Sequence, residues 1–255
     1  MLAKLPCLGC MAAAAMVLLA GCVPRVEAGL PAPVAEPTDP ARVYAAARRR
    51  EDFIHTLRAR FAATVTRLHD VRRAEGVLVV KKPDRFRLRL LSAFGFTVFD
   101  YVSWGAHARL ELPLEGRRIE DDQIASHSAF APSDMRALFL REARPAHLTC
   151  VPATESGTDT VVTCRDGEGQ TRRRVRIDSA TATVREETQL AGDHVDVTMR
   201  FGDYRAVDAT LLPYHIELLY PERAVRLAIT VRSYEVNPEL ADDLFVWPRR
   251  AGVDR

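Results

Sequence analysis

The sequence has few lysines and none of the short motifs that indicate common enzyme chemistry. Lysine occurs at positions 4, 81 and 82 only, so arginine supplies nearly all of the positive charge, and the formal net charge is +2. No basic run is interleaved with stacking aromatic residues, so we expect no nucleic-acid partner. HExxH, GxSxG, Walker-type and GxGxxG motifs are absent. The seven histidines are scattered, with no carboxylate or cysteine at ligand spacing. These absences predict a protein that is not an enzyme and has no cofactor and no metal site.

A short apolar run lies near the N-terminus, and it is too short to span a bilayer. The run Met11–Ala20 follows the positive charge of Lys4 and continues into Gly21-Cys22. Together these features resemble the lipobox of bacterial lipoproteins, in which a small residue precedes the cysteine that receives the lipid. The resemblance implies a signal peptide over residues 1–21 and acyl chains on the sulfur and amino group of Cys22.

The residue after the lipidated cysteine bears on the membrane in which the protein resides. Val23 occupies the position where Asp would favour retention in the inner membrane, so the lipobox resemblance points to the outer membrane. An ordinary signal peptide with a chance cysteine is the alternative.

Of the five cysteines, two are predicted to pair. Cys7 and Cys10 would leave with the signal peptide, and Cys22 would be lipidated. Cys150 and Cys164 then remain in an oxidising compartment, on two strands that flank a turn. A disulfide between them would close a loop of about 15 residues and stabilise the fold by roughly 3 kcal/mol.

The remaining chain divides into a tether, one domain and a short tail. Residues 22–39 comprise the lipidated cysteine and a proline-rich tether, 40–248 form the domain, and 249–255 are the tail. Asp39 before Pro40 is a typical start of a helix. A helix of about 20 residues should open the domain, because apolar residues recur at helical spacing. They are Val43, Ala46, Ala47, Phe53, Ile54, Leu57 and Phe61.

Beyond the first helix the apolar residues alternate with polar ones, which is typical of strands with one buried face. About ten short strands follow one another, and their connections are too short for parallel crossovers, so the sheet should be antiparallel. The predicted fold class is mainly β (α+β): a curled antiparallel half-open β-barrel, with a few helices covering its apolar concave face. The side chains predicted to line this face as a lipid cavity are Phe86, Leu88, Leu90, Val175, Ile177, Val197, Met199, Ile216, Leu218, Leu227 and Ile229.

The turn Ser92-Ala93-Phe94-Gly95 holds an aromatic residue where turns usually hold polar ones. Two interpretations are open. Phe94 folds back onto the protein's own core, as buried loop aromatics do. Alternatively, Phe94 projects from the hairpin and contacts a membrane or a lipid.

Two segments resemble the LolB family of outer-membrane lipoprotein receptors. Asp84–Leu88 followed by Leu91–Gly95 looks like the family's D-R-[FY]-R-L strand and its apolar loop, and Ser133–Leu140 is similar to the family's short helix over the cavity. The resemblance implies that a LolA-like periplasmic carrier delivers lipoproteins, whose acyl chains enter the cavity before insertion into the inner leaflet of the outer membrane. A monomer is expected.

The resemblance also assigns roles to particular residues. A membrane-insertion loop would consist of Ala93, Phe94, Gly95 and Phe96, with Phe94 in place of the family's leucine. A lid helix would present Met135, Leu138 and Phe139. The alternative function is a non-enzymatic envelope lipoprotein of the same fold that binds a protein partner in assembly or signalling, because a fold does not determine a function.

The lipobox leads to a direct test. Cys22→Ser should abolish acylation, because the thiol that accepts the lipid is removed. Incorporation of labelled palmitate in cells measures the outcome, and normal labelling of the variant would show that Cys22 is not the anchor.

Overall fold

One large antiparallel sheet accounts for almost all of the regular structure in the computed structural model, which describes residues 39–105, 107–120, 147–154 and 159–246. Its strands are β1 (Thr56–Arg67), β2 (Asp70–Lys81), β3 (Arg85–Leu91), β4 (Thr97–Trp104), β5 (His107–Leu112), β6 (Arg117–Glu120), β7 (Thr149–Thr154), β8 (Asp159–Arg165), β9 (Thr171–Asp178), β10 (Thr183–Ala191), β11 (His194–Val207), β12 (Thr210–Tyr220) and β13 (Val225–Val236). Short 3-10 turns η1 (Pro113–Glu115) and η3 (Asp242–Phe245) accompany them.

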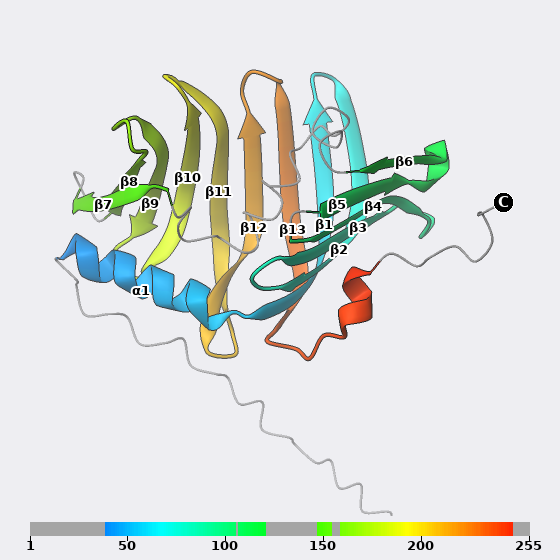
Figure 1. Cartoon of the computed structure of the whole chain (residues 1–255), viewed down its shortest axis with the longest axis horizontal. Helices are drawn as coiled ribbons and strands as arrows, with labels where there is room; N and C mark the ends of the chain where they lie inside the picture. The colour runs from blue at the N-terminus through cyan, green and yellow to red at the C-terminus, as the bar shows by residue number, and fades with distance from the viewer. Residues whose placement is uncertain (1–38, 106, 121–146, 155–158, 247–255) are drawn as a thin grey trace, which may run out of the picture.

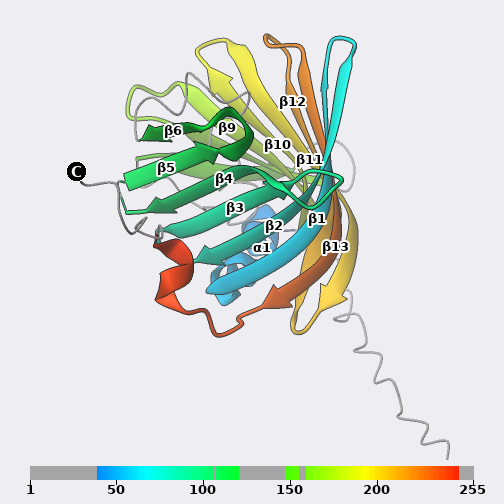
Figure 2. The same cartoon turned by 90° about the vertical axis from the view of Figure 1, so that its right-hand side faces the viewer.

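The strand order shows two meanders joined in the middle of the sheet. It runs β6-β5-β4-β3-β2-β1-β13-β12-β11-β10-β9-β8-β7, so every neighbouring pair except β1 and β13 is consecutive in the chain. The sheet curls strongly, and its outer strands β6 and β7 are not paired with each other (Figures 1 and 2). The predicted half-open antiparallel barrel is therefore confirmed, with more strands than the ten expected.

Helix α1 (Pro40–Phe53) lies across one end of the concave face (Figure 1). The side chain of Asp39 accepts a hydrogen bond from Ala41 N at 2.9 Å, and Pro40 is the first helical residue, as the sequence predicts. The buried side chains of α1, Val43 and Ala47, join the main hydrophobic core on the inner face of the sheet. The core therefore lies between the curled sheet and this helix.

The predicted length of the first helix is wrong. It ends at Phe53, and Leu57 and Phe61 belong to β1, where both side chains are buried on the inner face. A spacing of four residues fits a helical face, but it also fits a strand, because four is an even number. The strand forms here because β1 pairs with β13 on one side and with β2 on the other.

The C-terminal segment covers part of the convex face. Phe245 and Leu240 pack on Val79, which points outward from β2. Arg87 donates hydrogen bonds to Leu244 O at 2.9 Å and to the buried carboxylate of Asp100 at 2.8 Å. The arginines that alternate along β3 thus hold the end of the chain against the sheet.

A second contact holds the same segment in place through Asp242. Lys81 Nζ and Arg85 Nη1 each lie 2.6 Å from Asp242 Oδ1. Hydrogen bonds from Lys81 and Arg85 hold the pKa of the Asp242 carboxyl below its usual value. This contact is therefore present at neutral pH and is lost as the pH falls through that lowered pKa.

A chain that begins at Val23 contains every residue that the structure describes. It therefore keeps the hydrophobic core, the disulfide and the contacts of the C-terminal segment that are described above.

Gly76 in β2 lies directly opposite Phe61 in β1, and the ring of Phe61 occupies the space where a Cβ of residue 76 would lie. Gly76→Ala should therefore destabilise the fold by about 1–3 kcal/mol through overpacking. Gly202→Ala in β11 is the matched control, because no heavy atom lies within 4 Å of its Cβ position. Urea unfolding measures both variants. Phe61→Leu should relieve part of the Gly76→Ala loss, and strictly additive losses would contradict this account.

Candidate functional site

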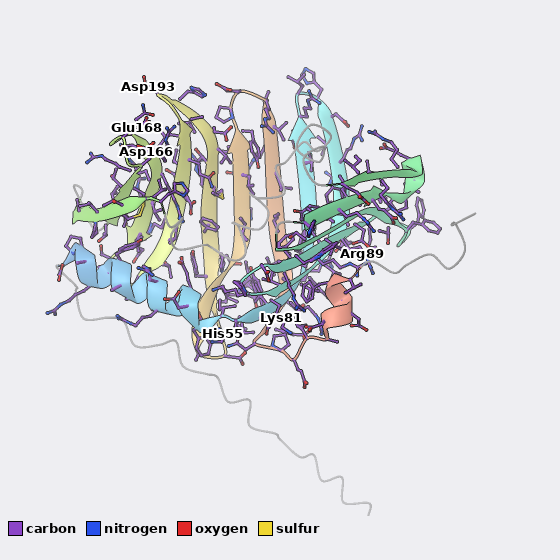
Figure 3. All side chains as sticks on the ribbon, viewed as in Figure 1. His55, Lys81, Arg89, Asp166, Glu168 and Asp193 are labelled. Carbon is purple, nitrogen blue, oxygen red and sulfur yellow. A yellow bond between two sulfur atoms is a disulfide. The ribbon has the colours of Figure 1, made fainter. Side chains whose placement is uncertain are left out.

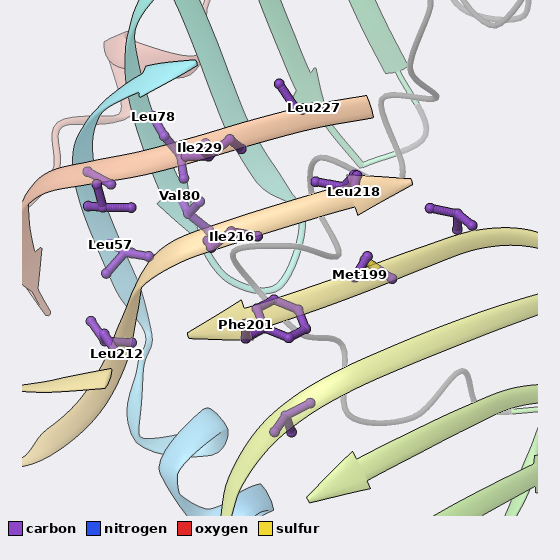
Figure 4. Close-up of a cluster of buried hydrophobic side chains, with 14 of the residues drawn as sticks. Leu57, Leu78, Val80, Met199, Phe201, Leu212, Ile216, Leu218, Leu227 and Ile229 are labelled. Atoms are coloured by element: carbon purple, nitrogen blue, oxygen red, sulfur yellow. The ribbon is translucent and has the colours of Figure 1, made fainter. Parts of the chain in front are cut away.

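The inner face of the sheet carries the side chains that the sequence predicts for the lipid cavity. Ten of the eleven are buried in one hydrophobic cluster, and Leu90 is partly buried against it. Neighbouring strands bring them into direct register: Ile216 lies opposite Ile229, and Leu218 lies opposite Leu227 (Figure 4). The result is a continuous apolar wall on one side of the sheet. Whether it holds a lipid stays a prediction.

A small cavity lies between the second half of α1 and the sheet. Its volume is about 40 Å³, which is enough for a few water molecules. Apolar side chains, among them Ile54 and Leu212, line much of it. The hydroxyl of Thr210 is also buried at its wall, and it has no hydrogen-bond partner among the residues that the structure describes. An acyl chain would need a larger space than this, so uptake at this point would require α1 to move away from the sheet.

Arg50 fixes the second half of α1 to the sheet. Its guanidinium donates hydrogen bonds to the carbonyl oxygens of Thr181 and Ala182, in the turn between β9 and β10, the latter at 3.1 Å. Partial burial lowers the pKa of Arg50 from its ordinary value. Because Arg50 lines the same small cavity, this contact closes the space between α1 and the sheet.

The inner wall also contains an ion pair that sequence reasoning missed. Arg173 Nη2 lies 2.7 Å from Glu187 Oε2, and these side chains are only 12% and 5% exposed. Arg173 stands between Arg172 and Arg174, and such a basic run is typical of a solvated face. However, Arg173 shares the inward side of β9 with Val175, and a register shift between Val184 and Glu186 turns Glu187 inward as well. The charge pattern of the sequence carries no signal for that shift.

The hairpin between β3 and β4 carries the predicted insertion loop. The backbone closes the turn itself: Ser92 N donates to Phe96 O at 2.8 Å, and Gly95 N donates to Ser92 O at 2.9 Å. Gly95 has φ +79°, which a side chain would disfavour. Phe94 is 86% exposed, and Ala93, Gly95 and Phe96 are exposed too. Phe94 is therefore not part of the core.

The other predicted sites fall in two groups. Cys150 and Cys164 are register partners on β7 and β8, and the structure joins them in a disulfide. Cys22 and the lid-helix residues Met135, Leu138 and Phe139 lie outside the described residues. Within the described residues, no group of three or more His, Cys, Asp or Glu side chains could hold a metal ion. Nor does that part of the chain contain a helix long and apolar enough to cross a membrane.

Comparison with known proteins gives matches in structure alone. No protein-family model matches the sequence. No curated protein matches it either. A LolA superfamily protein from Nitrosomonas europaea aligns with a TM-score of 0.58 and 8% identity, over 82% of this chain and 97% of its own. The fold is LolA-like.

Two further solved structures have a similar fold. A domain from Vibrio parahaemolyticus, described as an outer membrane lipoprotein-sorting protein, aligns with a TM-score of 0.62 and 13% identity, over 80% of this chain and 94% of its own. A DUF1329 family protein from Desulfovibrio piger aligns with a TM-score of 0.61 and 14% identity, over 82% of this chain and 98% of its own. At these identities the likeness establishes the fold, and the function has to be argued from the site.

Proposed function

We propose that this protein is a lipid-anchored receptor of the outer membrane, which accepts acylated lipoproteins and inserts them into that membrane. The observation that carries the proposal is the continuous apolar inner wall of an unclosed sheet. In this scheme Cys22 anchors the protein, a LolA-like carrier delivers the cargo, and the domain faces the periplasm. The transfer requires no bond to be made or broken, so it needs no catalytic residue.

The physics of lipid transfer explains why an apolar wall is needed. Each acyl CH₂ moved from an apolar environment into water costs about 0.8 kcal/mol. A lipoprotein with three acyl chains carries dozens of these groups, so it cannot leave its carrier without a second apolar surface. The inner wall supplies that surface, on a sheet whose outer strands β6 and β7 do not pair with each other.

The exposed hairpin supplies the contact with the membrane. Moving one Phe side chain into an apolar phase is worth roughly 1.5–3 kcal/mol. This is enough to favour a tethered loop in the bilayer and too little to hold it there permanently. Because the turn is closed by its own backbone hydrogen bonds, Phe94 can enter and leave the bilayer without a change in the fold.

Cargo binding is tested with the chain that begins at Val23. Native mass spectrometry should show a one-to-one complex with a triacylated peptide and none with the same peptide lacking acyl chains. A photoreactive group at the end of an acyl chain should label the inward residues Val197 and Met199 more than Thr198 and Arg200, which alternate with them in β11. The absence of an acyl-dependent complex would refute lipid carriage and favour the protein-binding alternative.

Phe94 is tested by a pair of variants. Phe94→Glu should leave the free energy of unfolding within about 0.5 kcal/mol, because the side chain is exposed. It should slow transfer of acylated peptide to liposomes while cargo binding persists. Phe94→Leu should preserve transfer, because an apolar side chain remains. Thermal unfolding provides the control, and a loss of stability several times larger in Phe94→Glu would mean that the loop is structural.

A further inference from the structure

Five exposed apolar side chains lie on the turns at one end of the β1–β6 half of the sheet. The register of the antiparallel pairs places the β1–β2, β3–β4 and β5–β6 turns at this same end. In Figure 2 the β1–β2 turn projects from the top of the view, and strands β3–β6 lie below it and to its left. Leu68 is 74% exposed and Leu114 is 72% exposed, so Phe94 is not isolated. We call this group the apolar rim: Leu68, Val71, Phe94, Phe96 and Leu114.

Leucine is conformationally unfavourable at position 68. It begins the two-residue turn between the paired residues Arg67 and Asp70, and its φ is +52°. Asn or Gly is favoured in such a turn, because a branched side chain is strained in the left-handed region. An exposed leucine here gains nothing from burial within its own chain. Neither turn geometry nor core packing therefore accounts for it, whereas contact with an apolar partner does.

Basic residues flank the apolar rim. Residues 67–73 and 112–118 contain five arginines and two carboxylates, Asp70 and Glu115. Three of the arginines form ion pairs, Arg72 with Asp70, Arg117 with Glu115 and Arg118 with Glu111, and the net charge of the group stays positive. All five arginines are exposed: Arg67, Arg72, Arg73, Arg117 and Arg118.

The turns of the other half of the sheet, at the same end, have the opposite character. They carry four carboxylates, Asp166, Glu168, Asp193 and Glu222, and one arginine, Arg223, and Asp166 is ion-paired with Arg172. Within the described residues they carry none of the large exposed apolar side chains. Figure 3 shows Asp166, Glu168 and Asp193 together at the upper left, on the opposite side of the view from β3–β6. At this end of the strands the β1–β6 half therefore carries the large exposed apolar side chains of the described turns, and the other half does not.

We propose that the apolar rim and its five arginines form a docking surface for an anionic lipid bilayer. This deepens the proposed function, on which it rests, by naming the surface and the lipid chemistry that bring the half-barrel to the membrane. Apolar side chains from three turns enter the interface, and the arginines bind lipid phosphates. Within the described residues, the exposed apolar turns belong to the β1–β6 half, so the sheet docks tilted, with that half toward the lipid.

Vesicle binding by the chain that begins at Val23 tests the proposal without the lipid anchor and without cargo. Sedimentation should show stronger binding to vesicles of phosphatidylcholine with phosphatidylglycerol than to phosphatidylcholine alone, and the difference should shrink as salt rises. Leu68→Asn combined with Leu114→Gln should weaken binding to the anionic vesicles at least about tenfold. Asn accepts the left-handed backbone at position 68, so the fold should be kept.

The matched control is Val151→Gln on edge strand β7, where the exposed apolar side chain lies outside the rim. It should leave vesicle binding unchanged. Equal binding by the rim variant and the parent, or no preference for phosphatidylglycerol, would overturn the proposal.

The proposed docking surface and the proposed cargo-receptor function can be refuted independently of each other. Vesicle binding that depends on the rim, in a protein that takes up no acylated peptide, would refute lipoprotein carriage and leave the docking surface standing. Uptake of acylated peptide without vesicle binding that depends on the rim would refute the docking surface and leave lipoprotein carriage standing.

Discussion

The pairing of β1 with β13 holds the rest of the structure together. All other neighbouring strands are consecutive in the chain, so each half of the sheet is a simple meander that needs a partner to close its core. The β1–β13 ladder runs from Leu57 opposite Val236 to Arg67 opposite Val225. Through it, inward side chains of both halves meet in one hydrophobic cluster. The apolar wall exists only because this one long-range ladder joins the halves.

Period-two alternation predicted most of this wall, because each strand has one apolar side and one polar side. The same pattern could not fix the boundaries. Leu57 and Phe61 fit a helix and a strand equally well, and only pairing with two neighbours decides between them. Strand β6 gives little signal in the sequence, because Arg117–Glu120 contains a single buried residue, Ile119. It forms a strand because its backbone pairs with β5 in an antiparallel ladder.

The charged residues were harder to predict than the apolar ones. Alternation identifies Arg87 as outward, but its partners include Leu244, which lies 157 residues away in the sequence. Arg173 is harder still, because a register shift decides which face the charges of its neighbourhood occupy. Phe94 shows the opposite case. Its place in a tight turn was visible in the sequence, and the exposed side chain follows from that local geometry.

The long sequence separation between β1 and its partner β13 has a consequence for folding. Asn237 Nδ2 donates a hydrogen bond to Phe53 O, a contact that spans 184 residues. The same side chain accepts a hydrogen bond from His55 N at 2.7 Å, so the start of β1 is fixed by a residue just beyond β13. During synthesis one side of β1 therefore stays unpaired until β13 has been made. Such long-range closure is slow, and an unpaired apolar strand is prone to aggregate. A half-barrel of this connectivity depends on being kept apart from its neighbours until its last strand arrives.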